Sequence, residues 1–471
     1  MLLADTSLLH TASDHFAKIC GHQYVSTDQW DLAAYERDMT LNLSFPFDIL
    51  VRPGTVGEIQ QILKVCDKYK IPVTARGGGS GVTGGALPVR GGVVLSLDRL
   101  NSILEINAVD GFVIAEAGVI TADLCASVAK AGLYFPPAPS SQSFSFVGGN
   151  VATNAGSINS CKYGMTGQYV LNLEVVLTSG EVCWTGSNVS KNSTGLNLTR
   201  LFVGSEGTLG IITKVVYKLL PAPVKEISLL AGFEDLAGAY KAIVAIRQSG
   251  LSPSAAELIC RNALDLTSEY LGEPLLLPGD SIAAHLLISL QDTGSGGLEE
   301  ILARTVTILE EHTGMDILKA DTFLEKDKLW RLRYNIGNAM TSGGRIYRDI
   351  DVCVPLSVLY EYIMKVEEIS RQYQVPMASF GHAMDGNLHT MLLSDEGRMI
   401  PDDPSFQKAI DGIYRFAISK GGVISGEHGI GYLQKDYLKL QFPEWQLTLM
   451  QRLKEVFDPG GILNPGKLFT D

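Results

Sequence analysis

The sequence has little of what a disulfide-stabilised, membrane-spanning or nucleic-acid-binding protein needs. Its seven cysteines are odd in number and scattered, with no Cys-x-x-Cys pair, which argues against a disulfide frame, a zinc ribbon or an iron–sulfur centre. No apolar run reaches the length of about 18 residues that a spanning helix needs, and no basic segment followed by an apolar stretch opens the chain. The net charge of −13 argues against nucleic acid as the main partner. These absences predict a cytoplasmic protein without a signal peptide or a transmembrane segment.

What the chain has in quantity is length and glycine. A chain of 471 residues is longer than a single hydrophobic core accommodates, which indicates two or three domains. Hydrophobic residues make up 46% and charged residues 19%, which is ordinary for a globular enzyme. A negative overall charge still leaves room for a local basic pocket that binds an anionic substrate.

Glycine is most concentrated between Pro72 and Ala86, where six of fifteen residues are glycine. Such a segment exposes backbone N–H groups that can form an anion-binding concavity. It is not a Walker loop, because no Gly-Lys-Ser/Thr follows, and the strand-like segment 91–97 after it excludes a Rossmann turn opening a helix. A flexible surface loop is the alternative, but the apolar strand-like segments on both sides favour a dinucleotide held by a loop between strands.

Helix and strand signals mix along the chain in the manner of an α+β protein. Thr55, followed three residues later by Glu58, predicts a helix start, and the segments 93–97 and 113–118 are predicted to be strands. The proline-rich stretch 221–223 predicts a domain boundary. Strand and helix signals alternate again from residue 226, which predicts a second α+β region.

Two histidines flank a strong turn signal, Asp385-Gly386. A two-residue hairpin loop there would pair His382 directly with His389, with their Cβ atoms roughly 5 Å apart on one face. Two imidazoles in that arrangement can share one metal ion. A hydrogen-bonded hairpin with solvent-facing histidines is the alternative.

A carboxylate and an imidazole stand together at Glu427-His428, between Gly426 and Gly429. Two histidines and one glutamate are a common ligand set for a catalytic divalent metal with an open position. The remaining histidine could act as a general base, because its pKa lies near working pH. The two clusters together predict a metal-assisted active site.

Six segments carry a resemblance to a known family, namely 76–86, 148–156, 204–213, 381–389, 426–429 and 457–467. Taken in order, they resemble the FAD-linked D-2-hydroxyacid dehydrogenases, a family that includes D-lactate dehydrogenases, glycolate oxidase flavin subunits and D-2-hydroxyglutarate dehydrogenase. The resemblance implies an α+β fold with a FAD-binding domain of the vanillyl-alcohol oxidase (PCMH) type, a cap domain with an antiparallel sheet, and a C-terminal tail that returns to the flavin. The implied domains are a helical segment 1–45, the FAD domain 46–223, the cap or substrate domain 224–425 and a segment 426–471 that completes the metal and flavin site.

The resemblance also assigns site residues. His382, His389 and Glu427 would bind Zn, Mn or Fe. His428 would take the hydroxyl proton, and Arg333 would anchor the substrate carboxylate. FAD would be held by Arg76, Gly77, Gly78, Gly79, Ser80, Gly81, Gly84, Pro139, Ser140, Gly149, Thr153, Asn154, Gly156, Glu206, Gly207, Gly210, Ile211 and Asn464.

The implied chemistry is oxidation of a 2-hydroxy acid, with hydride transfer to flavin N5. No histidine lies in the glycine loop, so FAD is expected to be non-covalent. Without an iron–sulfur extension, electrons must leave to a separate acceptor, namely a quinone, an electron-transfer flavoprotein or a cytochrome. The oligomeric state stays open between a homodimer and an oxidase-complex subunit, and the electron acceptor could hold the protein at a membrane surface.

Three positions depart from the hydroxyglutarate branch of the family. Gly337 and Met391 stand where that branch has Thr and Asn, and a substrate-binding Lys of that branch falls near Asp349, although Arg345 and Arg348 are close by in sequence. A second substrate carboxylate therefore has no clear partner, which favours D-lactate or glycolate over D-2-hydroxyglutarate.

Three other functions stay open at this point. One is the FAD subunit of a multi-subunit glycolate oxidase. Another is a nicotinamide-dependent flavin reductase of the kind that acts on cell-wall precursors, which would not need the histidine clusters. The third is a non-catalytic flavin subunit, which should lack one of the two clusters.

Overall fold

The computed structural model describes residues 6–277, 279, 281–294, 296–313, 315–342, 346–394 and 403–469. The chain divides into two compact units, each treated by itself below. The first unit comprises Met1–Gly156, Met165–Pro221 and Glu427–Asp471, and the second comprises Ser157–Gly164 and Ala222–Gly426.

A small four-stranded sheet, ordered β1-β2-β4-β3, forms one part of the first unit. Strands β2, β4 and β3 run parallel, whereas β1 is antiparallel to β2. Helix α3 begins after Thr55, whose hydroxyl accepts a hydrogen bond from the N–H of Glu58, so the predicted helix start is confirmed. The elements are α1 (Thr6–Cys20), η1 (His22–Tyr24), β1 (Val25–Ser26), α2 (Gln29–Ala33), β2 (Ile49–Val51), α3 (Val56–Tyr69), β3 (Val73–Arg76) and β4 (Val93–Ser96).

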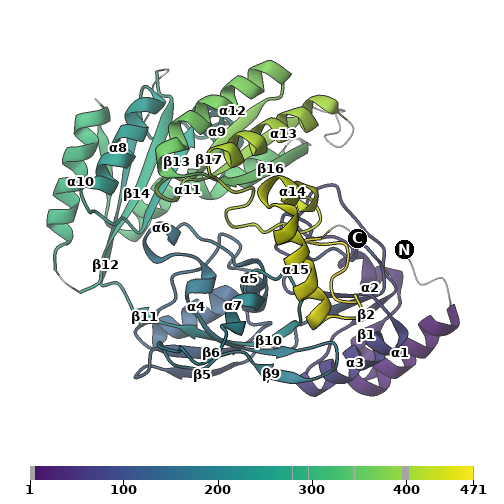
Figure 1. Ribbon diagram of the computed structural model, residues 1–471. Coiled ribbons are helices and arrows are strands. Elements are labelled where there is room, and N and C mark those ends of the chain that lie inside the picture. Colours follow the sequence, from purple (N-terminus) through teal and green to yellow (C-terminus); the bar gives the residue numbers. More distant parts are fainter. Residues whose placement is uncertain are drawn as a thin grey trace. The chain divides into compact units, whose positions relative to one another are not determined.

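A five-stranded antiparallel sheet, ordered β5-β6-β10-β8-β9, forms the other part of the first unit. Helices α4, α5 and α7 lie over one of its faces (Figure 1). The buried hydroxyl of Tyr217 donates to the carbonyl of Val147 at 2.9 Å and so fixes α5 on the sheet. The elements are β5 (Ile103–Asn107), β6 (Phe112–Glu116), α4 (Thr121–Lys130), β7 (Leu133–Tyr134), α5 (Val147–Thr153), η2 (Thr166–Gln168), β8 (Val170–Val176), β9 (Val182–Trp184), α7 (Leu198–Phe202), β10 (Ile211–Lys218) and β11 (Leu220–Pro221).

The C-terminal segment belongs to the first unit and is bound into it. Leu463 forms an isolated bridge with Val73 of β3. The ammonium of Lys454 donates to the carbonyls of Thr208 and Leu463, at 2.7 and 2.8 Å. The segment contains η7 (Lys435–Tyr437), α14 (Leu438–Gln441) and α15 (Glu444–Phe457). The segment around Leu463 is thus fixed beside the strand that enters the glycine loop.

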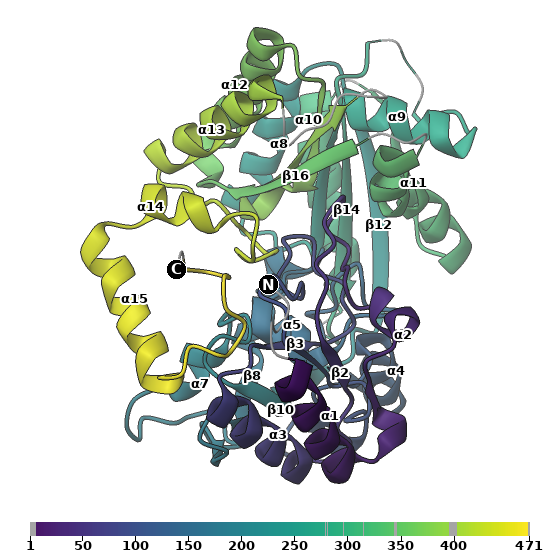
Figure 2. The same ribbon diagram turned by 90° about the vertical axis from the view of Figure 1, so that its right-hand side faces the viewer.

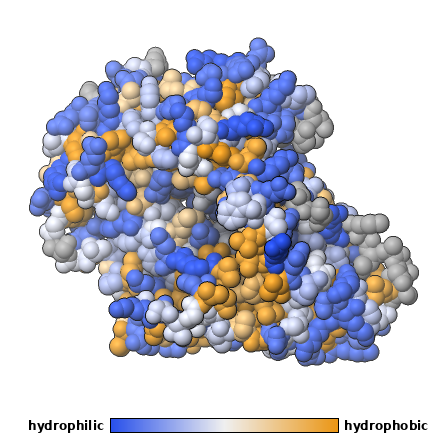
Figure 3. All heavy atoms as spheres, viewed as in Figure 1, coloured by the Kyte–Doolittle hydropathy of each residue, from blue (hydrophilic) through white to orange (hydrophobic). Residues whose placement is uncertain are grey.

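Helix α15 also carries apolar side chains on its outer side. Trp445, Leu449 and Val456 are 68%, 51% and 75% exposed, and Figure 3 shows hydrophobic residues gathered on the surface at this helix. No residue of α15 is fully buried. The helix is therefore held through Lys454 and Phe457, whose ring meets that of Phe202 edge-on, rather than by a buried stripe.

The second unit is built on one seven-stranded antiparallel sheet, ordered β15-β12-β14-β13-β17-β18-β16. Its central strands are almost continuously buried, as expected for a sheet covered on both faces. The strands are β12 (Lys225–Phe233), β13 (Ala255–Cys260), β14 (Ala284–Asp292), β15 (Ile317–Ala320), β16 (Ile346–Cys353), β17 (Met377–His382) and β18 (Asn387–Ser394).

Helices cover this sheet in two groups (Figure 2). Helices α9 and α11 pack together on one face, and α8, α10, α12 and α13 pack on the other. Helix α11 begins with a capping box formed by Thr322 and Glu325, and Trp330 donates to Ser228 in the sheet. The helices and turns are α6 (Ser160–Tyr163), α8 (Leu236–Gln248), α9 (Arg261–Leu271), α10 (Leu298–Thr313), α11 (Phe323–Thr341), η4 (Leu356–Val358), α12 (Leu359–Tyr373), η5 (Ala383–Asp385) and α13 (Pro404–Ser419).

The α+β class predicted from the sequence is confirmed in both units. Within the described part of the chain, no helix has both the length and the hydropathy that crossing a bilayer requires. The candidate site residues of the first unit fall on the glycine loop, on the segments 139–156 and 206–211 and on the C-terminal segment, and those of the second unit fall on the sheet and on α11.

Candidate functional site

The glycine loop lies between β3 and β4 and forms no helix, so its predicted position between strands is confirmed. Gly79 has a φ of +68°, which favours glycine. A Cβ at Gly78 would lie 2.0 Å from the carbonyl oxygen of Phe144, so the loop packs directly on a neighbouring backbone. A Cβ at Gly81 would meet no atom within 4 Å. The loop therefore packs tightly at one point and presents open, half-buried backbone at another.

A second glycine segment, at the start of α5, faces this loop. A Cβ at Gly148 would lie 2.6 Å from that of Ala117, which is why α5 can pack so closely on the five-stranded sheet. A Cβ at Gly149 would meet no atom within 4 Å, whereas one at Gly77 would lie 3.8 Å from the Cα of Gly149. Two facing glycine segments with open positions at Gly81 and Gly149 fit a dinucleotide whose phosphates bind backbone N–H groups.

The polar residues at the C-terminal end of α5 form hydrogen bonds within the protein. The hydroxyl of Thr153 donates to a carbonyl of α5 at 3.2 Å, and the side-chain oxygen of Asn154 accepts from the N–H of Gly167 at 2.8 Å. A Cβ at Gly156 would lie 2.2 Å from a carboxylate oxygen of Glu427. Gly156 therefore leaves room for Glu427, while contacts of these residues with flavin remain predictions.

Arg76 ends β3 at the entrance to the glycine loop. Its guanidinium donates to the carbonyl of Tyr35 and lies over that tyrosine ring, and burial lowers its pKa. The charge is thus held inside the first unit beside the proposed phosphate site. The other predicted flavin residues in this unit are Ser80, Gly84, Pro139, Ser140, Gly207, Gly210 and Ile211.

Glu206 binds the segment that follows the predicted base. Its carboxylate accepts hydrogen bonds from the N–H groups of Ile430 and Gly431, both at 2.7 Å. Burial raises the pKa of Glu206, although these two backbone bonds act in the opposite direction. Both carboxylate oxygens are thus used to hold the chain just after His428, a role that the sequence did not predict.

Asn464 and Lys467 fasten the C-terminal tail to the glycine loop. The amide of Asn464 donates to the carbonyls of Gly85 and Glu206, at 3.0 and 2.7 Å. The ammonium of Lys467 donates to the carbonyls of Gly85 and Leu87, and burial lowers its pKa to about 7. The tail therefore returns to the predicted flavin loop, and its side chains donate hydrogen bonds to the backbone carbonyls of that loop.

Glu427 and His428 lie at the start of this C-terminal segment in the first unit. The carbonyl of His428 accepts from the hydroxyl of Thr83 in the glycine loop at 3.3 Å. The Nε2 atom of His428 lies 3.7 Å from a carboxylate oxygen of Glu427. Thr83 thereby places the predicted base next to the loop proposed to hold FAD.

In the second unit, the hairpin β17–β18 carries His382 and His389, but in a different register from the one predicted. His382 pairs with Asn387, and His389 pairs with Phe380, so the two histidines are diagonal neighbours. The loop spans four residues, because residues 383–385 form a 3-10 turn before Gly386 at φ +74°. The two rings still lie on one face, edge to face with centroids 5.6 Å apart.

The longer loop has a structural cause. A type I′ turn needs positive φ at both central residues, and of the two predicted turn residues, Asp385 and Gly386, only Gly386 has it. A Cβ at Gly386 would lie 1.9 Å from the carbonyl of Val354, and the N–H of Val354 donates to the carbonyl of Gly386. Contact with the end of β16 thus sets the turn, which the local sequence could not show.

A fully buried carboxylate, Glu257 on β13, joins His382 to Arg333. Its Oε1 lies 2.5 Å from Nδ1 of His382, and its Oε2 accepts from Nε of Arg333 at 2.6 Å. Burial opposes ionisation of Glu257, but the charges of His382 and Arg333 outweigh it and lower its pKa to about 2. Arg333, predicted to anchor substrate, also lies over the ring of Phe380.

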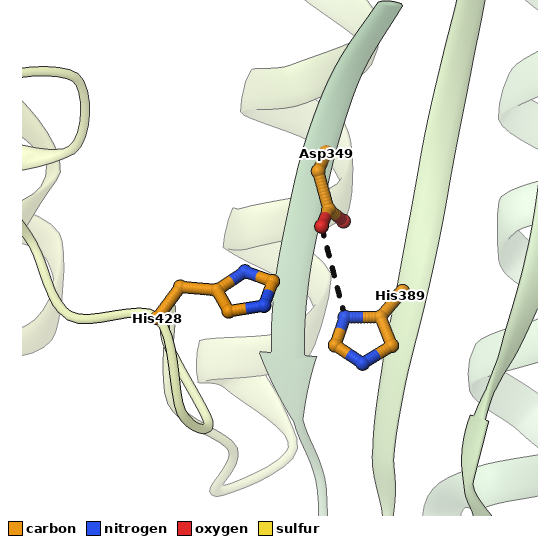
Figure 4. A group of neighbouring side chains, drawn as sticks. All are labelled: Asp349, His389 and His428. Atoms are coloured by element: carbon orange, nitrogen blue, oxygen red, sulfur yellow. Dashed lines mark ion pairs between the residues drawn. The ribbon is translucent and has the colours of Figure 1, made fainter. Parts of the chain in front are cut away.

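His389 has acidic neighbours on β16. Its Nδ1 atom lies 3.8 Å from Oδ2 of Asp349, the pair joined by a dashed line in Figure 4, and 3.9 Å from Oδ1 of Asp351. Asp351 is fully buried and accepts from the amide of Asn387 at 2.8 Å. His428, also drawn in Figure 4, belongs to the first unit. Two carboxylates of β16 therefore lie close to the ring of His389.

The sequence did not single out Glu257 or Asp351. The available signal was a charge inside an otherwise apolar strand, such as Glu257 within Ala255–Cys260. Such charges are almost never fully buried unless paired. Arg345, noted in the sequence as a nearby cation, lies outside the described residues.

Two family models match most of the chain. The model for the FAD binding domain matches residues 47–186, and the model for the C-terminal domain of FAD linked oxidases matches residues 222–468. The first match contains the glycine loop, and the second contains both histidine clusters.

Curated relatives match over almost the whole length. A D-lactate dehydrogenase of Anaerostipes hadrus is 37% identical over 89% of each chain. The glycolate oxidase subunit GlcD of Bacillus subtilis (strain 168) is 35% identical over 93% of this chain and 92% of that protein. Among solved structures, p-cresol methylhydroxylase with substrate bound aligns with a TM-score of 0.79 at 20% identity, covering 99% of this chain and 98% of the other. That last likeness shows a shared fold.

Proposed function

The chain belongs to the FAD-linked oxidases of the D-lactate dehydrogenase and glycolate oxidase type, and from this premise we propose that it oxidises D-lactate or glycolate to the 2-oxo acid. The observation that carries the proposal is the hairpin β17–β18, which brings His382 and His389 to one face of the sheet. Neighbouring imidazoles of this kind suit a metal that binds a hydroxy acid.

The proposed metal ligands are His382, His389 and Glu427, and the proposed metal is Zn, Mn or Fe. Imidazole and carboxylate donors suit these ions. The N–H of Gly426 donates to the carbonyl of Asp351 at 2.8 Å, and Asp351 is the cross-strand partner of His389. Since Glu427 is the next residue, the chain enters the Glu427-His428 segment from the strand beside His389, which supports a shared site.

The residues divide the chemistry among them. When bound, FAD supplies a two-electron oxidant that takes the C2 hydrogen as hydride at N5, and a divalent cation supplies Lewis acidity that lowers the pKa of the hydroxyl. His428 accepts the hydroxyl proton. Arg333 uses Nε on Glu257 and has its other guanidinium N–H groups for the substrate carboxylate.

The position of Asp349 is an argument for a substrate with a single carboxylate. Its carboxylate lies 3.8 Å from the ring of the proposed ligand His389. A second substrate carboxylate placed there would meet like charge, which is unfavourable at short range. The proposed substrate is therefore a monocarboxylate rather than D-2-hydroxyglutarate.

A second candidate is the flavin subunit of a multi-subunit glycolate oxidase, favoured by the relatives named glycolate oxidase subunit GlcD. In both cases electrons would pass from the flavin to a separate acceptor, such as a quinone, an electron-transfer flavoprotein or a cytochrome. Copurification of further subunits after mild lysis would favour this candidate.

Replacing His389 tests the proposed function directly. His389→Ala should lose most bound metal and at least about 100-fold in turnover of the hydroxy acid, because one of three ligands is gone. Flavin content should stay that of wild type. Metal content by mass spectrometry and dye-linked turnover are the measurements, and His22→Ala, at an exposed histidine, is the matched control. Full turnover in metal-free His389→Ala would contradict the proposal.

A further inference from the structure

Glu257 is the one carboxylate that touches both a proposed metal ligand and the proposed substrate anchor among the described residues of the second unit. It is fully buried on β13, directly opposite His382 on β17 in the cross-strand register. Residues paired in this way have side chains on the same face and within contact distance. The strand pairing therefore fixes the carboxylate against the imidazole.

The two hydrogen bonds of Glu257 define which ring nitrogen of His382 carries a proton. Arginine is always a donor, so Oε2 accepts from Nε of Arg333 at 2.6 Å. The other oxygen, Oε1, faces Nδ1 of His382 at 2.5 Å and can only accept. Nδ1 must then hold a hydrogen whether the ring is charged or neutral, so when the ring gives up its second proton to bind a metal, the lone pair is on Nε2.

We propose that Glu257 is a positioning residue, which holds His382 in the Nδ1–H tautomer with Nε2 directed to the metal and at the same time orients Arg333 for the substrate carboxylate. This inference rests on the proposed function, because it needs the metal site to exist. A carboxylate behind a metal-binding histidine fixes the tautomer and the ring orientation, and its loss typically weakens metal affinity 10- to 100-fold.

Packing around the pair supports a positioning role. The guanidinium of Arg333 lies 4.9 Å from the ring centroid of Phe380, and that ring lies 5.2 Å from the ring of His389. Glu257 and Phe380 thus link the proposed substrate anchor, Arg333, to both histidines. The linked residues lie on α11, β13, β17 and β18. Rotation of any one ring would disturb its neighbours.

Glu257→Gln separates this role from simple space filling. An amide has one acceptor oxygen and one donor nitrogen, so the introduced glutamine side chain could accept from Arg333 or from His382 but not from both. If its oxygen faces Arg333, its NH₂ faces Nδ1 and favours the Nε2–H tautomer, which cannot bind metal through Nε2. The side-chain volume hardly changes.

The test uses the full-length flavoprotein after removal and re-addition of Zn²⁺. Glu257→Gln should bind Zn²⁺ 10- to 100-fold more weakly by competition with a chelator, with unchanged flavin absorbance. In the metal-free protein labelled with ¹⁵N-histidine, the His382 signal should move from the Nδ1–H pattern toward Nε2–H. Glu174→Gln is the matched control, since Glu174 is a buried, ion-paired glutamate of the first unit, and it should leave both readouts unchanged.

The outcomes separate this inference from the proposed function. Wild-type Zn²⁺ affinity and an unchanged tautomer in Glu257→Gln, alongside lost metal in His389→Ala, would overturn the positioning role alone. A wild-type protein that oxidises hydroxy acids without any divalent metal would instead overturn the proposed metal site. If Glu257→Gln does not fold, Glu257→Asp keeps two acceptors but withdraws them by one methylene. That variant should then show a smaller loss of affinity, and wild-type affinity would again contradict the inference.

Discussion

At the scale of single residues, this protein depends on buried charged and polar groups that are each given partners. The carboxylate of Glu257 is hydrogen-bonded to His382 and Arg333, and that of Glu206 accepts from two backbone N–H groups of the C-terminal segment. Burying a charge is costly unless it is paired and hydrogen-bonded. These groups therefore mark where the fold fixes the proposed site rather than merely filling space.

His285 should make the second unit sensitive to acid. It is 2% exposed in β14, and burial lowers its pKa from 6.5 to about 4. Below pH 6.5 the unfolded chain takes up a proton that the folded protein does not, so stability present at neutral pH is lost as pH falls from 6.5 to 4, by about 3 kcal/mol.

His285→Phe tests this by removing the titrating group while keeping a ring of similar size. Its free energy of unfolding, from urea titrations at pH 7.5 and pH 4.5, should fall less between the two values than that of wild type. His22→Phe, at an exposed position, should behave like wild type. Equal losses in all three proteins would refute the assignment to His285.

Two glycines of the loop should respond differently to added side chains. Gly81→Ala adds a methyl group where no protein atom lies within 4 Å, so the fold should survive while FAD affinity falls at least about tenfold, because the methyl group intrudes on the cofactor. Gly78→Val would meet the carbonyl of Phe144 and should lose both FAD and stability. Flavin content and thermal unfolding of the apoproteins distinguish the two effects. Normal flavin binding by Gly81→Ala would place the cofactor elsewhere.

At the scale of elements, local sequence signals such as caps and turn residues predicted much of the fold. They failed where contact with a segment far away in the sequence sets the local structure. The Thr55 cap predicted α3 because capping depends on residues three apart. Asp385-Gly386 predicted a turn correctly but the wrong register, because the carbonyl of Val354 in another segment sets the loop. Glu257 escaped notice for the same reason: its partners lie 76 and 125 residues away.

Helix α11 offers a test of its own stability. Gly337 lies exposed inside this helix, and a Cβ there would meet no atom within 4 Å. Gly337→Ala should therefore raise the free energy of unfolding by about 1 kcal/mol, through the higher helix propensity of alanine. Urea titration measures the gain. Destabilisation by Gly337→Ala would contradict the open surroundings of this position.

At the scale of the whole molecule, the chain distributes the proposed chemistry over two units. The first unit carries the loop proposed to bind FAD, together with Glu427 and His428, and the second carries His382, His389 and Arg333. Six sequence segments sufficed to recognise the family, which the comparisons then showed. Substrate, metal and electron acceptor could not follow from the sequence in the same way, because relatives with similar motifs carry the names of different activities.

The central claim is that the bound flavin is reduced by a small 2-hydroxy acid with the help of a divalent metal. The decisive measurement is anaerobic bleaching of the purified protein's flavin absorbance by a panel of D- and L-2-hydroxy acids and glycolate, with and without chelator. Rapid bleaching by D-lactate or glycolate, abolished by chelator and restored by Zn²⁺ or Mn²⁺, is the predicted result. Bleaching by a reduced nicotinamide and by none of the acids would contradict the claim and indicate a flavin reductase.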